Sequence, residues 1–314
     1  MAYTSTPHLI DIGSHSLALY THGPEPSNDT EPVVFFVSGV SSDSLNWQAV
    51  VRQLSESRSY TYDRSGYHNS EPSPRAPSAE NIALELSLLI EKAPITNPLI
   101  LVGHSWAGVL LHEYFALKGV EQIAGLVLVD ANHETHLQKM NPDDPILWNV
   151  VGAGLEPYAA MGIEAQHKLT EEEWRLFKMV QSGDKYETIS QKEDSEYPSS
   201  FGTLQRKGLS KKQPLLEERP VFVIGATRSR DWTGIYEAGV AKGNGNEDER
   251  AHVREMIRTV DEKTKQLQTE FLKLSTKSKL VFASESGHFV QLTQPEIVVD
   301  GVKWVQDNLA KSST

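Results

Sequence analysis

A serine surrounded by small residues is the first candidate for chemistry in this sequence. Ser105 lies in Gly103-His-Ser-Trp-Ala-Gly108, after the apolar run Leu99-Ile-Leu-Val102 and before a helix-like run over 109–117. Such a motif occurs by chance in many chains, but its position between a buried strand and a helix makes it specific. A sharp turn there would project the hydroxyl and would tolerate only small neighbours. We therefore predict that Ser105 is a nucleophile; the alternative is a serine that caps a core helix.

A serine nucleophile needs a base, and His288 is the best candidate. Of the eleven histidines, it alone follows the last predicted core strand, in Ser284-Glu-Ser-Gly-His288. A histidine in that loop can take the serine proton, although an exposed loop histidine is the simpler alternative. Ser14-His15 precedes the nucleophile, and His133-Glu-Thr-His136 lacks the spacing of a zinc-binding HExxH motif.

Two aspartates could orient the imidazole and stabilise its cation. Asp130 directly follows the apolar run 126–129, whereas Asp231 lies beyond the run 221–224, after a loop with two arginines. Those arginines could pair with Asp231 as an ordinary surface ion pair. We favour Asp130 and keep Asp231 as the alternative.

The negative charge that develops during attack needs two backbone N–H donors. One should belong to Trp106, the residue after the nucleophile. The other should come from the loop Ser38-Gly-Val40, with Val40 as the best candidate. Without Ser105, Ser38-Gly39 would be equally well explained as a simple turn.

These groups require a rigid scaffold, and the sequence predicts one. Five runs are apolar at almost every position, which is typical of parallel strands buried on both faces: 33–37, 99–102, 126–129, 221–224 and 280–283. Helical patterns at 78–92, 109–117 and 295–309 alternate with them. An α/β fold with a doubly wound, mostly parallel sheet follows. A hairpin over residues 9–20 precedes the first of these runs.

Two long segments interrupt the alternation of strands and helices. Residues 131–213 contain helix-like pieces at 145–161 and 170–180, and Thr170 with Glu173 could form a capping box. We predict that this segment is a helical lid, inserted between a first core part (1–130) and a second one (214–314). The other segment, 227–276, ends in a charged helix that begins near Asn246 and presents a solvated face.

Composition excludes several classes of function. The net charge of -12 argues against nucleic acid as a partner, and the absence of cysteine excludes thiolate nucleophiles and disulfides. No stretch has the roughly 18 apolar residues of a membrane helix, and the first residues lack a signal-peptide pattern. A cytoplasmic protein that acts on a small molecule is the expectation, and the oligomeric state stays open.

Taken in order, these landmarks resemble the α/β-hydrolase superfamily, and most of all its lid-bearing branch of esterases, lactonases and epoxide-hydrolase-like enzymes. The chain departs from many relatives in having Ser38 where they carry histidine. The resemblance implies the fold, a Ser105–His288 dyad, Val40 and Trp106 as oxyanion donors, and no cofactor or metal. Relatives with an acid after the penultimate strand have it about two residues before the position of Asp231, which favours Asp130. The remaining matches are Tyr62-Asp-Arg-Ser-Gly66 with Ser70, and Gln294-Pro-Glu296.

Three functions follow as hypotheses. The first is hydrolysis of a carboxylic ester or lactone of an apolar small molecule through an acyl-enzyme; lid aromatics such as Trp148 and Trp174 suggest an apolar substrate. The second is epoxide opening or cyclisation, with Asp130 and His288 as acid and base. The third is ligand binding without catalysis. An aspartate nucleophile is disfavoured because Ser105 stands in its place.

Overall fold

One twisted sheet forms the centre of the molecule. The computed structural model describes residues 6–309, and within them the strand order is β1-β2-β4-β3-β5-β6-β7-β8. Neighbouring strands from β4 to β8 are parallel, whereas β2 pairs antiparallel with β1 and with β4. The strands are β1 His8–Asp11, β2 Ser16–His22, β3 Val33–Val37, β4 Ser59–Tyr62, β5 Leu99–His104, β6 Ile123–Val129, β7 Val221–Ala226 and β8 Ser278–Ala283. The predicted doubly wound α/β fold is confirmed, and so is the hairpin.

Both faces of the sheet are covered, which explains the all-apolar runs. Successive residues of β3 point to opposite faces of the sheet, so that Phe35 belongs to one hydrophobic cluster and Phe36 to another. Helices α2 and α3 complete one cluster, and α1 and α13 complete the other. The bounds are α1 Gln48–Val51, α2 Ala79–Lys92, α3 Ala107–Lys118, α12 Val290–Thr293 and α13 Pro295–Asp307. The predicted helices at 78–92, 109–117 and 295–309 are therefore present, with shifts of one or two residues at their ends.

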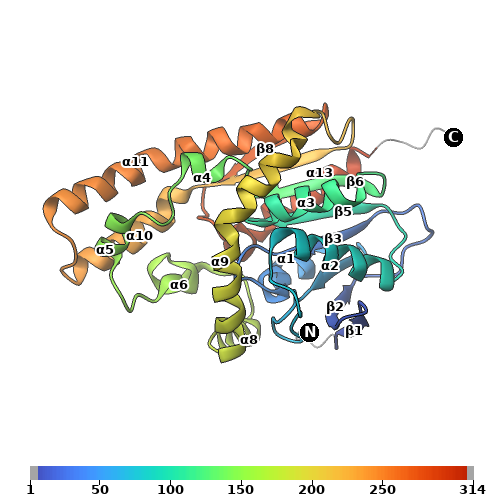
Figure 1. Cartoon of the computed structure of the whole chain (residues 1–314), viewed down its shortest axis with the longest axis horizontal. Coiled ribbons are helices and arrows are strands. Elements are labelled where there is room, and N and C mark those ends of the chain that lie inside the picture. The colour runs from blue at the N-terminus through green and yellow to red at the C-terminus, as the bar shows by residue number, and fades with distance from the viewer. Residues whose placement is uncertain (1–5, 310–314) are drawn as a thin grey trace.

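The remaining helices form a cap over one end of the sheet (Figure 1). Between β6 and β7 lie α4 His136–Lys139, α5 Pro145–Val151, α6 Pro157–Ala160, α7 Ile163–Gln166, α8 Glu171–Gln181 and α9 Asp184–Lys207. Between β7 and β8 lie α10 Arg228–Ala241 and α11 Glu247–Glu270. Both α10 and α11 pack against α5, so the two insertions meet. We refer to helices α4 to α11 together as the cap.

Two details of the cap differ from the sequence predictions. A continuous helix over 145–161 is wrong, because Gly152 and Gly154 adopt positive φ angles of 75° and 69° and separate α5 from α6. The segment before Asp231 is not a loop, since α10 already begins at Arg228. The capping box of Thr170 and Glu173 is confirmed at the start of α8.

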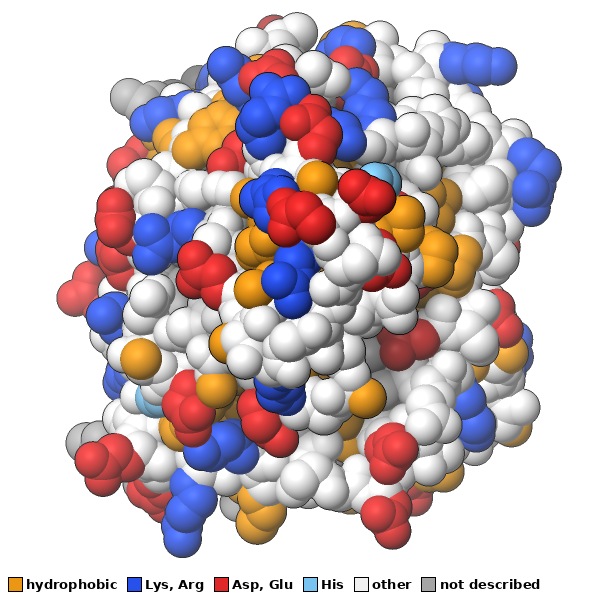
Figure 2. Space-filling model, turned by 90° about the vertical axis from the view of Figure 1, so that its left-hand side faces the viewer, with side chains coloured by type: hydrophobic (Ala, Val, Ile, Leu, Met, Phe, Trp, Pro, Cys, Tyr) orange, Lys and Arg blue, Asp and Glu red, His pale blue; other side chains and the backbone are white. Residues whose placement is uncertain are grey.

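The charged helix α11 presents a solvated face, as predicted. Arg254 pairs with Glu247 and Arg258 pairs with Glu255, and all four side chains are largely exposed. Acidic and basic side chains are interspersed over the cap end of the molecule (Figure 2). Every helix in residues 6–309 is too short or too polar to span a membrane.

Candidate active site

Ser105 occupies a strained turn between β5 and α3. Its φ angle is 55°, in the left-handed region that residues other than glycine rarely adopt. A Cβ on Gly103 would lie 2.7 Å from Leu111, and one on Gly108 would lie 2.4 Å from the Asn132 carbonyl oxygen. The small residues around Ser105 are therefore required by close packing, as the sequence predicted.

The loop after β3 lies against Ser105. A Cβ on Gly39 would approach the Cβ of Ser105 to 2.7 Å, so only glycine lets the two backbones come this close. Within residues 6–309, the N–H groups of Val40 and Trp106 donate to no other protein group. Both predicted oxyanion donors are thus free to bind a ligand at this turn.

The structure brings His288 and Asp130 together. His288 Nδ1 donates to Asp130 Oδ2 at 2.7 Å, and Asp130 Oδ1 accepts from the Ala226 N–H at 3.2 Å. Burial opposes ionisation of Asp130, but Arg228 and the bond from His288 outweigh it and hold the pKa well below its usual value. Burial and Arg228 lower the pKa of His288. These effects favour the neutral imidazole, and no protein group in residues 6–309 donates to its Nε2.

Asp231 contacts the same histidine in a different way. Its Oδ2 accepts from the backbone N–H of His288 at 2.6 Å, and its carboxylate fills the space that a Cβ on Gly287 would need. The alternative of a surface ion pair at Asp231 does not hold, because Asp231 is only 5% exposed and Arg228 binds Asp130. Burial raises the pKa of Asp231 to about 6. Asp231 thus holds the loop of His288, while Asp130 holds the ring.

The structure does not join Ser105 to His288 by a hydrogen bond. Ser105 Oγ donates instead to Asn132 Oδ1, at the long distance of 3.4 Å. The hydroxyl of Tyr197, from α9 of the cap, donates to the same oxygen at 3.3 Å. The sequence points to neither Asn132 nor Tyr197, because no motif marks a side chain that reaches the site from a loop or a cap helix.

His104, which precedes Ser105 in the chain, supports the loop of His288. Its Nε2 donates to the His288 carbonyl at 2.9 Å, and the two rings lie 4.4 Å apart between centroids. Gln291 Nε2 contacts His104 Nδ1 at 3.2 Å, which fixes the tautomer. Burial and the neighbouring His288 lower the pKa of His104 well below its usual value, so it stays neutral.

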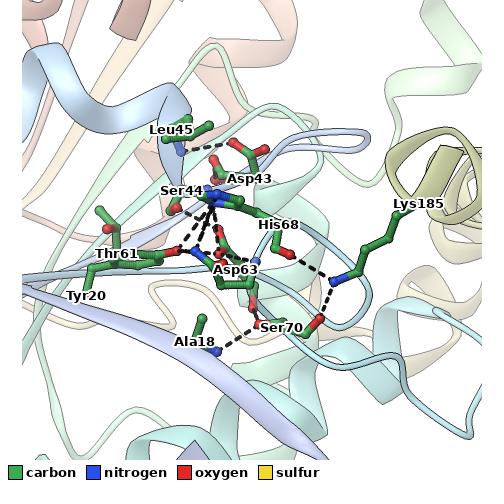
Figure 3. A network of polar contacts seen from close by, with 12 residues as sticks. Ala18, Tyr20, Asp43, Ser44, Leu45, Thr61, Asp63, His68, Ser70 and Lys185 are labelled. Atoms are coloured by element: carbon green, nitrogen blue, oxygen red, sulfur yellow. Dashed lines mark hydrogen bonds and ion pairs between the residues drawn. The ribbon is translucent and has the colours of Figure 1, made fainter. Parts of the chain in front are cut away.

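Asp63, in the landmark Tyr62-Asp-Arg-Ser-Gly66, organises a polar network beneath the cap (Figure 3). Its carboxylate accepts from the hydroxyls of Tyr20 and Ser44, at 2.7 and 2.6 Å. Lys185 of α9 donates to the carbonyl oxygens of His68 and Ser70, at 2.9 and 2.7 Å. The segment 62–66 therefore has a structural role, because its hydrogen bonds and those of the loop that follows connect the cap, β2 and the loop after β4.

The next residue, Arg64, links the cap to the oxyanion loop. Its guanidinium donates to the carbonyl oxygens of Ser38 and Gly39, at 2.8 and 2.6 Å, and to both oxygens of Glu193 in α9, each at 2.8 Å. Glu193 also accepts from the Ser41 N–H at 3.0 Å. Arg64 and Glu193 are 3% and 1% exposed. A buried ion pair thus fixes the loop that carries Val40 against the cap.

We expect Glu193→Gln to loosen this connection, because it leaves the buried Arg64 charge without a counter-charge. Breaking a buried pair in this way costs about 3–5 kcal/mol. The measurement is urea denaturation, together with limited proteolysis of α9. Glu196→Gln, on the same helix, is the control. Equal denaturation midpoints for the two variants would contradict the expected role.

A second buried carboxylate, Asp43, makes stability depend on pH. Burial and the neighbouring Asp63 raise the pKa of Asp43 to about 7, against 3.8 without these effects. Its Oδ1 accepts from the Leu45 N–H, whereas Oδ2 is buried without a hydrogen-bond partner. The folded state therefore binds more protons than the unfolded state between these two pKa values. Stability must fall as the pH rises through that window.

We expect Asp43→Asn to remove the loss of stability at high pH, because an amide stays neutral and can still accept from the Leu45 N–H. Calorimetry should give a higher melting temperature for the variant at pH 8, with a smaller difference at pH 5. Asp29→Asn, at an exposed position, is the control. A difference that stays constant with pH would show that Asp43 does not cause the effect.

Comparison of this sequence with known proteins identifies the family to which the chain belongs. The model of the "Alpha/beta hydrolase family" matches residues 34–301, so the chain belongs to that family. It is 31% identical over 303 residues to "Probable transporter efuK" of Hormonema carpetanum, covering 95% of this chain and 42% of that protein. It is 27% identical over 298 residues to an "AB hydrolase superfamily protein" of Gibberella zeae, covering 91% and 90%. The chain thus spans less than half of the first relative's length.

Solved structures show the same fold. Cfl2 from Burkholderia cenocepacia has a TM-score of 0.66 at 15% identity, with 98% of each chain covered. The epoxide hydrolase CorEH has 0.59 at 15%, covering 96% of this chain and 98% of its own. A thermophilic esterase from Thermogutta terrifontis has 0.55 at 20%, covering 97% and 100%. Esterases and epoxide hydrolases therefore share this architecture, and only the site can distinguish between them.

Proposed function

We propose that this protein hydrolyses a carboxylic ester or lactone of a small molecule, with Ser105 as nucleophile, His288 as base and Asp130 as the supporting acid. The observation that carries the proposal is the strained turn of Ser105, against which the loop of Val40 is packed through Gly39. A hydroxyl held on such a turn beside two unpaired N–H groups suits attack on a carbonyl carbon. The pairing of His288 with Asp130 supports the same assignment.

The proposed reaction proceeds in two halves. Ser105 Oγ turns from Asn132 to Nε2 of His288, which removes its proton as Oγ attacks the carbonyl. The N–H groups of Val40 and Trp106 stabilise the tetrahedral oxyanion. His288 then protonates the leaving alkoxide, and water releases the acyl group by the reverse proton transfers. Asp130 keeps Nδ1 protonated throughout, and no cofactor takes part.

A cluster of apolar side chains in the cap favours an apolar substrate. Tyr158, Trp174 and Phe177 form a hydrophobic cluster with Leu45 and Leu292. Phe289 joins this cluster to the site, with its ring 5.3 Å from that of His288 and 5.8 Å from that of Tyr158. Trp148, by contrast, is 52% exposed and is not part of this cluster.

Labelling with a fluorophosphonate tests the proposal directly, because only an activated serine reacts with it. We expect one labelled peptide that contains Ser105, together with hydrolysis of short p-nitrophenyl esters. Folded protein that neither labels at Ser105 nor cleaves an ester or lactone would overturn the proposed function.

Epoxide opening by Asp130 and His288 is the second candidate, and one observation favours it. The cap places the Tyr197 hydroxyl beside Asn132, where it could donate to a substrate oxygen near Ser105. Activity on an epoxide that survives Ser105→Ala but not Asp130→Asn would decide for this candidate.

A further inference from the structure

Arg228 uses only part of its hydrogen-bonding capacity. Its Nε donates to Asp130 Oδ2 at 2.5 Å. Within residues 6–309, its two terminal nitrogens have no protein acceptor, and neither is sealed from solvent. The side chain is nevertheless only 15% exposed. A guanidinium carries five N–H donors, so four of them are available in a largely enclosed place.

A second unpaired group lies in the same region. The imidazole of His136, in α4, is 6% exposed and makes no hydrogen bond with the rest of residues 6–309. Its ring packs against Phe201 at 6.1 Å between centroids. Burial and the charge of Arg228 lower the pKa of His136 to about 3. His136 is therefore neutral, and its imidazole N–H has no acceptor among residues 6–309.

Both groups belong to the neighbourhood of the nucleophile. Arg228 is joined to His288 through Asp130 Oδ2, which both residues contact. His136 is linked to the site through two rings of the cap, because it packs against Phe201, whose ring lies 5.0 Å from that of Tyr197. The Tyr197 hydroxyl shares Asn132 Oδ1 with Ser105. Contacts of core and cap residues thus link Arg228 to His288 and His136 to Ser105.

We propose that the terminal nitrogens of Arg228, assisted by His136, bind a carboxylate of the substrate, which would then be an ester or lactone that also carries an acid group. This inference rests on the proposed function. The Nη1 and Nη2 edge of a guanidinium matches the two oxygens of a carboxylate. Asp130 does not compete for that edge, because it is bound by Nε and is also held by His288 and the Ala226 N–H. The opposing view is that Arg228 serves only as the counter-ion of Asp130.

Two matched substrates separate these views. Mono-p-nitrophenyl glutarate and p-nitrophenyl pentanoate have acyl chains of equal length that end in a carboxylate or a methyl group. The measurement is the ratio of their kcat/KM values, in which any effect of Arg228 on Asp130 and His288 cancels. We expect Arg228→Gln to lower this ratio at least about tenfold. Arg228→Lys should lower it less, since it keeps the charge but loses the planar pair of donors.

Arg230→Gln is the matched control, because Arg230 is an exposed arginine of the same helix. It should leave the ratio as in the wild type. If Arg228→Gln reduces the cleavage of both substrates by the same factor, Arg228 is only the counter-ion of Asp130 and the inference is wrong.

A binding measurement distinguishes failure of this inference from failure of the proposed function. Calorimetry with Ser105→Ala protein should detect glutarate monoamide, which keeps one carboxylate, more strongly than pentanamide, which has none. Arg228→Gln added to that variant should remove the difference. If glutarate monoamide binds in an Arg228-dependent way to protein that fluorophosphonate does not label, the carboxylate site at Arg228 stands and the proposed hydrolase function is wrong. If fluorophosphonate labels the protein but binding does not depend on Arg228, the proposed hydrolase function stands and the carboxylate site is wrong.

Discussion

Ser105→Ala is expected to reduce the hydrolysis of a reactive ester by on the order of 10⁴-fold or more and to abolish fluorophosphonate labelling. The physical reason is that no other hydroxyl shares its position on the turn between β5 and α3. An alanine also fits that turn, because it keeps the Cβ of Ser105, and Gly39 already leaves the space that this atom occupies. The folded state should therefore survive the change.

The measurement is kcat/KM on p-nitrophenyl butyrate, with circular dichroism to verify folding. Ser199→Ala is the control, since Ser199 is an exposed serine of α9 in the cap. It should retain wild-type activity and labelling. Ser105→Ala protein that keeps more than a tenth of the ester hydrolysis would exclude Ser105 as the nucleophile.

The order of the chain explains why the places of Ser105 and His288 in the fold could be predicted. Strands covered on both faces are apolar at each position, and the parallel sheet places the loops after β3, β5, β6 and β8 at one edge. Ser105 directly follows β5, and His288 lies in the short loop after β8. Strand β4 escapes prediction because it is short and carries Ser59 and Thr61, of which Thr61 bonds across the sheet to His22.

The cap could be predicted only in part. Helix α9 has no apolar stripe, because its buried residues include Glu193 and Ser200 as well as Phe201 and Leu204. These polar side chains are buried with partners, Arg64 for Glu193 and Trp106 for Ser200. Such pairs join residues more than 90 positions apart, and hydrophobic periodicity contains no information about them.

The supporting groups of the site are the least predictable. Asp130 and Asp231 both end near His288, and only the folded chain shows that one contacts the ring and the other the backbone. From the sequence, the two arginines near Asp231 could pair with it, whereas in the structure Arg228 binds Asp130. Asn132 contacts Ser105, and Tyr197 contacts Asn132 from a cap helix, so no spacing in the sequence marks them.

The second prediction with a large effect concerns these two aspartates. We expect Asp130→Asn to lower kcat by on the order of 10³–10⁴-fold, because an amide neither fixes the tautomer of His288 nor stabilises its cation. Asp231→Asn should lower kcat less than about tenfold, since its amide oxygen can still accept the His288 N–H. A large loss in Asp231→Asn with near-normal activity in Asp130→Asn would reverse the assignment of the acid.

Stability complicates the comparison, because Asp130→Asn also leaves Arg228 without its partner. Removing one side of a buried pair destabilises by about 3–5 kcal/mol, so part of any activity loss could come from unfolding. The double variant Asp130→Asn with Arg228→Gln removes both charges and should recover much of the stability. If Asp130 acts on the imidazole, this recovery leaves kcat on a neutral ester as low as in Asp130→Asn alone. If activity returns together with stability, Asp130 serves the fold and not the reaction.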